Sequence, residues 1–72
     1  MQIREHEGFQ IQIRNSESGY MAEVYRKENL LKIIRGEETF SGEKPFSSAA
    51  LALEAAQRWS DTALILSILY TQ

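Results

Sequence analysis

Apolar and polar residues alternate strictly in the segment FQIQIR, residues 9–14. Its three apolar side chains share one parity and its three polar side chains share the other. A period of two places the apolar set on one face of an extended strand. The segment is therefore predicted to be a half-buried β-strand, and Ile3, which keeps the apolar parity, allows that strand to begin earlier.

Two further strands are predicted over residues 20–26 and 30–35, with turn-forming residues between the strands. A loop of two or four residues after residue 26 places Val24 opposite Ile33, whereas a three-residue loop places Val24 opposite Lys32 and mixes the faces. We expect the loop of even length. The inner face then carries Phe9, Ile11, Ile13, Tyr20, Ala22, Val24, Leu31 and Ile33, and the apolar residues of the outer face are Met21, Tyr25, Leu30 and Ile34.

A helix is predicted to follow a long connection, residues 36–46, in which Phe40 and Phe46 are expected to contact the core. A short fourth strand at residues 39–40 is an alternative for part of this connection. Ser48 marks the helix start, because serine is a favoured N-cap residue. Beyond it a stripe recurs at helical spacing, namely Ala52, Ala55, Ala56, Trp59 and Ala63. The stripe predicts a helix over residues 48–59 packed on the inner face, with Trp59 buried near Phe9, Ile11 or Val24.

The C-terminal segment is too long to lie on such a sheet. A helix over residues 48–70 would be about 34 Å long, whereas a strand of six or seven residues reaches about 20–23 Å. The helix must overhang or break, and residues 60–62 are the expected break because Ser, Asp and Thr favour caps over helix interiors. The tail beyond them, ALILSILY, is apolar on every side. As helix or strand, it can pack within the chain or in a dimer.

Length, net charge and the lack of cysteine limit the kinds of protein that this chain can be. The 72 residues suit one α+β domain, residues 1–72, and the formal net charge of −2 gives no overall attraction for nucleic acid or anionic lipid. Without cysteine the chain forms neither a disulfide nor a thiolate metal site, and His6 is interpreted as a solvated residue. We expect no enzymatic activity, no catalytic, cofactor-binding or metal-binding residues, and a cytoplasmic protein without a membrane span.

A junction of Phe46-Ser47-Ser48 precedes alanines at helical spacing, Ala52, Ala55 and Ala56. With three antiparallel strands before it, this layout resembles the C-terminal two-thirds of the double-stranded-RNA-binding domain. That family carries phosphate-binding lysines at the start of this helix, whereas residues 48–52 contain no basic residue here. The family's first helix also has no counterpart, so the resemblance implies layout alone. The same layout resembles small uncharacterised β-β-β-α domains that occur alone or in tandem.

The expected function is that of a non-enzymatic protein-interaction or self-association module, with a homodimer or another protein as the partner. The candidate interface lies on the apolar tail and comprises Leu64, Ile65, Ile68, Leu69 and Tyr70. The alternative is a weak nucleic-acid-binding domain that uses the open face of the sheet, through Arg14, Tyr25, Lys27 and Lys32. A third hypothesis places a small-molecule site between residues 36–46 and the helix.

Overall fold

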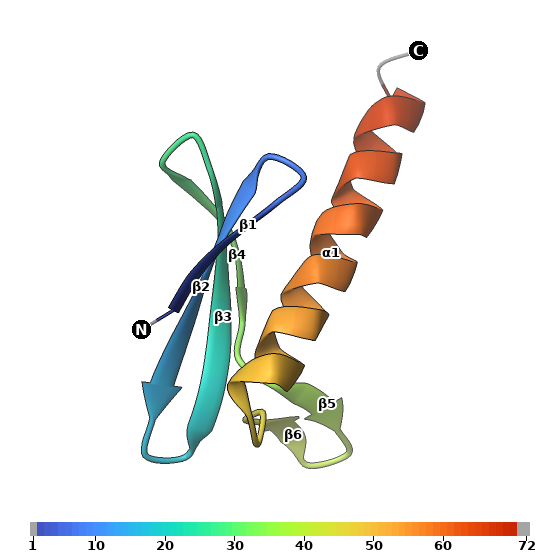
Figure 1. Ribbon diagram of the computed structural model, residues 1–72. Helices are drawn as coiled ribbons and strands as arrows, with labels where there is room; N and C mark the ends of the chain where they lie inside the picture. The colour runs from blue at the N-terminus through green and yellow to red at the C-terminus, as the bar shows by residue number, and fades with distance from the viewer. Residues whose placement is uncertain (1, 71–72) are drawn as a thin grey trace.

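The computed structural model describes residues 2–70 of the chain and, for Tyr70, the backbone alone. A four-stranded antiparallel sheet runs in the order β1-β2-β3-β4, and one helix, α1, crosses one of its faces (Figure 1). A two-stranded hairpin, β5-β6, links the sheet to the helix. The elements are β1 Gln2–His6, β2 Phe9–Ser16, β3 Gly19–Arg26, β4 Asn29–Ile34, β5 Glu37–Thr39, β6 Gly42–Lys44 and α1 Ala49–Tyr70. The predicted α+β class is confirmed, with more strands than expected.

The additional strand of the main sheet arises from a turn at Glu7 and Gly8. Their φ angles of 52° and 85° are both positive, as in the tight turns that best join twisted antiparallel strands. The chain therefore reverses before Phe9, and β1 pairs with β2 from His6↔Phe9 to Gln2↔Ile13. The reversal places Ile3 opposite Gln12, on the outer face, where it is exposed. The parity argument that extended the first strand back to Ile3 is therefore wrong.

The register of β4 also differs from the prediction. Lys27 and Glu28 form a two-residue turn, which has the expected even length, but the register shifts between Val24 and Tyr25. One extra residue in β4 moves each later side chain of the strand to the opposite face of the sheet. Val24 therefore lies opposite Lys32, and Ala22 lies opposite Ile34. As a result Ile34, rather than Ile33 or the exposed Leu31, packs against the core.

The core lies between the inner face of the sheet and α1. Its buried residues are Phe9, Ile11, Ile13, Ala22, Val24, Phe46, Ala52 and Ala56. Alanines on the helix let it lie close to β2 and β3, as the stripe predicted. Trp59 is half-buried and meets the Phe9 ring edge-on, with ring centroids 6.4 Å apart and an interplanar angle of 74°. Its predicted position near Phe9 is thus confirmed, whereas its predicted burial is only partial.

The helix does not break at residues 60–62. The Ser60 hydroxyl is buried and donates to the carbonyl oxygen of Ala56 at 2.8 Å, and the Thr62 hydroxyl donates to that of Arg58 at 3.0 Å. Each hydroxyl thus finds a backbone acceptor one turn earlier, so neither needs a helix end. The 22-residue α1 therefore continues as one helix to Tyr70, and the predicted break is wrong.

Candidate interaction surface

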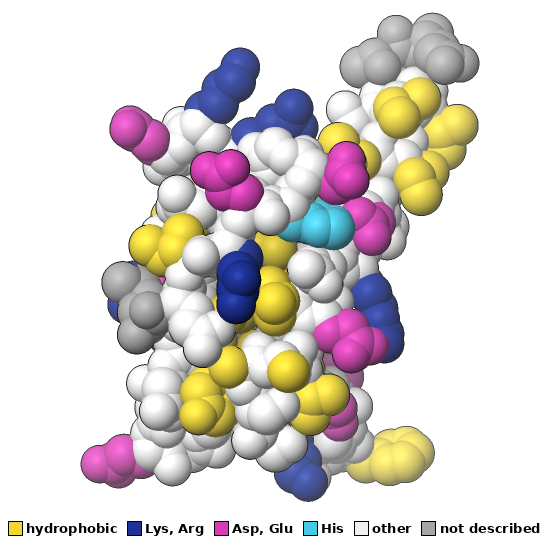
Figure 2. Space-filling view, viewed as in Figure 1, with side chains coloured by type: hydrophobic (Ala, Val, Ile, Leu, Met, Phe, Trp, Pro, Cys, Tyr) yellow, Lys and Arg dark blue, Asp and Glu magenta, His cyan; other side chains and the backbone are white. Residues whose placement is uncertain are grey.

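The C-terminal end of α1 extends past the sheet (Figure 1). Its large side chains are exposed: Ile65 by 59%, Leu66 by 46%, Ile68 by 57% and Leu69 by 65%. These four residues are called the tail surface below. Hydrophobic side chains accordingly gather around this end of the helix in Figure 2. Of the other predicted interface residues, Leu64 packs partly against the core, and the side chain of Tyr70 lies outside the described residues.

Helical spacing makes the tail surface contiguous. Ile65 and Leu69 are four residues apart, and Ile68 and Leu66 lie three residues from one or the other, so their side chains are neighbours. From residue 63 to residue 70 the sequence contains no charged residue. A contiguous apolar patch of this kind marks a contact site more often than scattered apolar residues do.

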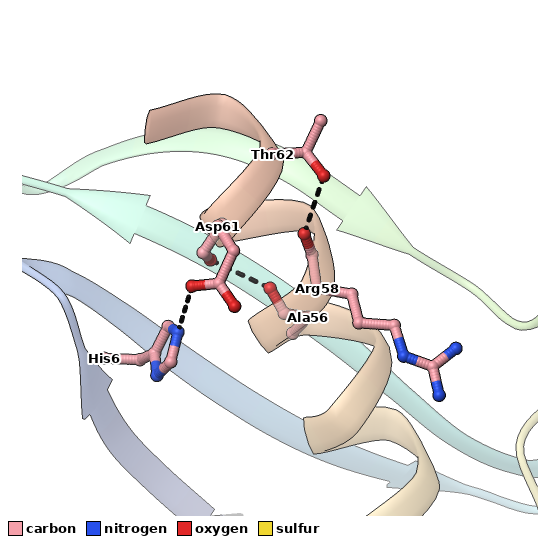
Figure 3. Close-up of polar contacts among 6 residues, drawn as sticks. His6, Ala56, Arg58, Asp61 and Thr62 are labelled. Carbon is pink, nitrogen blue, oxygen red and sulfur yellow. Dashed lines mark hydrogen bonds and ion pairs between the residues drawn. The ribbon is translucent and has the colours of Figure 1, made fainter. Parts of the chain in front are cut away.

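A polar contact holds α1 to the sheet just before this surface. The Nε2 atom of His6, at the end of β1, lies 2.7 Å from Oδ1 of Asp61 (Figure 3). His6 is half-buried, so its interpretation as a solvated residue is wrong. No local pattern could have indicated the pair, because the two residues are 55 positions apart. The contact joins the end of β1 to α1 one turn before the tail surface.

Breaking this contact is expected to cost little stability. Exposed ion pairs contribute about 0–1 kcal/mol, and Asp61 is largely exposed. We therefore expect His6→Ala to lower the free energy of unfolding by less than about 1 kcal/mol, as measured by urea denaturation. Glu5→Ala, an exposed change in the same strand, is the control. A much larger loss for His6→Ala would show that β1 depends on this contact.

The structure separates the residues proposed for nucleic-acid binding. Arg14 and Tyr25 share the outer face, and both bind Glu23: the Arg14 Nε donates at 2.5 Å and the Tyr25 hydroxyl donates at 3.3 Å. The hydrogen bond that Arg14 donates to Glu23, together with the negative charge of Glu23, raises the pKa of Arg14. Lys32 lies on the inner-face side of β4, and Lys27 lies in the β3-β4 turn. The four residues do not form one basic surface.

A pocket of about 240 Å³ opens between the end of β4, the base of the β5-β6 hairpin and α1. Its apolar lining comes from Ile34, Phe46, Leu51 and Ala55, and its charged lining includes Glu54 and Arg58, which form an ion pair. Drug-sized ligands occupy pockets of about 300–1,000 Å³. The pocket lies where the third hypothesis placed a small-molecule site, and its volume is below this range.

Residues 2–70 hold no group of three or more His, Asp or Glu side chains placed to bind a metal ion. Nor do these residues include a helix with the length and apolar character needed to cross a membrane. The chain was compared with protein-family models, with curated proteins and with solved structures, and none of the three comparisons gave a match.

Proposed function

We propose that this protein is a non-enzymatic self-association module whose docking element is the tail surface. The observation that carries the proposal is the exposure of four large, uncharged side chains on the part of α1 that extends past the sheet. Such side chains gain free energy when a partner removes them from water. The sheet of the same chain ends before this part of α1, so the tail surface stays exposed to solvent.

The pattern of the tail surface favours a second copy as the partner. Its residues are symmetric about position 67: Ile65 mirrors Leu69, and Leu66 mirrors Ile68. Two tails that cross antiparallel about this position therefore place every member of the surface against another member. Such a two-fold contact is closed and self-complementary, which is the commonest symmetry of dimers.

The charge of Asp61 also favours antiparallel over parallel packing of the two tails. Parallel tails would bring Asp61 beside the Asp61 of the second copy, and like charges in contact are unfavourable. Antiparallel tails separate these carboxylates and place the two sheets at opposite ends of the pair. The absence of basic residues from the last turn of α1 argues against an anionic lipid surface as the alternative partner.

The interface is small, so the association is expected to be weak. A standard protein interface covers about 800 Å² per partner with about 20–30 residues, whereas the tail surface offers four side chains. Association must also offset the loss of translational and rotational freedom. We expect a Kd of roughly 1–100 μM, about −8 to −5 kcal/mol.

Disulfide cross-linking tests the arrangement directly, because the natural chain contains no cysteine. We expect an equimolar mixture of Ile65→Cys and Leu69→Cys proteins to form covalent dimers faster than either variant alone. Ala50→Cys, exposed at the other end of α1, is the control. Cross-linking of the mixture no faster than the control would contradict the proposal. Preferential 65–65 and 69–69 linkage would instead show parallel tails.

A further inference from the structure

The β5-β6 hairpin, called the arm below, stands apart from the main sheet (Figure 1). Two backbone hydrogen bonds between Tyr20 and Phe46, of 2.9 and 3.2 Å, fix the chain just beyond its base. A two-stranded hairpin is marginally stable by itself. Glu38 and Glu43 also face each other across this one, and like charges directly opposite weaken strand pairing. The internal contacts of the arm therefore give it little stability.

The tip of the arm carries a fully exposed phenylalanine. Phe40 lies in the turn between β5 and β6 with a relative exposure of 114%, which contradicts the sequence-based expectation that it contacts the core. Thr39 and Gly42 organise the turn: the Thr39 hydroxyl donates to the Gly42 carbonyl oxygen at 2.6 Å, and Gly42 has a φ of 115°. Turn geometry does not require an aromatic residue at this position.

The base of the same arm forms one wall of the pocket described above, because Gly36 and Glu37 line it. A cavity of about 150 Å³ lined by aliphatic and aromatic side chains accommodates benzene, so 240 Å³ is enough for a phenyl ring. Phe40 cannot reach the pocket of its own chain, because the extended β5 separates the arm's tip from its base by about 10 Å.

We infer that the pocket receives Phe40 from a second copy of this chain. Two arms that lie side by side in opposite directions bring each tip to the other's base, so one two-fold axis satisfies both pockets. An aromatic side chain seated in a pocket is the usual form of an interface hot spot.

The charges near the contact are compatible with this arrangement. The tip, residues 39–42, is uncharged, so it can approach a pocket lined by both acidic and basic side chains. Next to the tip, Glu38 would lie near the partner copy's pocket, where Arg58 is 77% exposed. Charge pairs at the rim of an interface set its register and suppress wrong partners.

The arm contact is independent of the tail surface. Figure 1 shows the arm near the N-terminal end of α1 and the tail at the other end. A protein that uses both contacts forms assemblies larger than a dimer, whereas loss of either contact leaves a dimer. The two proposals therefore fail separately.

Sedimentation velocity of the Ile65→Glu protein isolates the arm, because a charge on the tail surface opposes contact there. We expect this protein to dimerise and the added Phe40→Ala change to weaken its dimer at least tenfold. Ser47→Ala, an exposed change outside the arm, is the control and should leave the dimer unchanged. A monomeric Ile65→Glu protein at high micromolar concentration, or a Phe40→Ala change without effect, would overturn the inference.

A mixing experiment tests the reciprocal fit. Leu51→Glu places a charge in the pocket but leaves the ring of Phe40, whereas Phe40→Ala removes the ring but leaves the pocket. In the Ile65→Glu background, each variant alone should be largely monomeric. Their mixture should form a heterodimer, because one ring and one pocket remain intact. A mixture no heavier than its components would contradict the reciprocal insertion.

Discussion

Replacement of Trp59 by alanine is expected to lower the free energy of unfolding by about 3 kcal/mol, near the lower end of the range for large aromatic residues. The indole packs edge-on against Phe9 and borders the buried alanines of α1. The lower end applies because Trp59 is half-buried rather than fully enclosed. Urea denaturation followed by far-ultraviolet circular dichroism measures the loss without the tryptophan signal.

Two further substitutions test whether the loss of stability comes from the aromatic contact of Trp59. Trp59→Phe keeps an aromatic ring on the helix and should cost less than about 1.5 kcal/mol. Arg58→Ala, at an exposed neighbouring position, should change the stability by about 0.5 kcal/mol or less. If Trp59→Ala melts within a few degrees of the natural protein, the contact with Phe9 does not hold the helix on the sheet.

The main sheet was predictable where one face is buried and the pattern is local. The alternation over residues 9–14 correctly assigned Phe9, Ile11 and Ile13 to the core. The same kind of argument failed in β4, because a single bulge changes which side chains face the core. Leu31, Ile33 and Ile34 are all apolar, so the sequence shows no alternation that reveals the bulge. When both faces of a strand offer apolar residues, sequence alone does not determine which set is buried.

Composition led us to expect a contact surface on the tail, because eight consecutive residues carry no charge. The structure shows large tail side chains exposed, and the role of the tail as a contact surface stays a prediction. The conformation of the tail could not be predicted from its composition. Helix continuity depended on Ser60 and Thr62, whose hydroxyls bond to the preceding turn rather than ending the helix. The exposure of Phe40 was not predictable, since an aromatic residue in a long connection is usually expected to pack on the core.

Gly36 controls the position of the arm, and its replacement should have a large effect. A Cβ atom added at Gly36 would lie 2.0 Å from the carbonyl oxygen of Lys44 and 2.8 Å from the backbone nitrogen of Pro45. Real side chains do not come this close to backbone atoms, so the base of the arm must open. We expect Gly36→Ala to lower the free energy of unfolding by about 2–3 kcal/mol, as overpacked sites do.

Gly42→Ala is the matched control, because it makes the same chemical change in the same hairpin. No atom lies within 4 Å of a Cβ at Gly42, so the cost there comes only from its φ of 115° and should be about 1 kcal/mol. Gly36→Ala should also distort the pocket wall that the base of the arm forms. It should therefore weaken arm-mediated dimers in the Ile65→Glu protein. Equal effects of the two glycine substitutions on stability would show that the close approach of Gly36 to Lys44 does not position the arm.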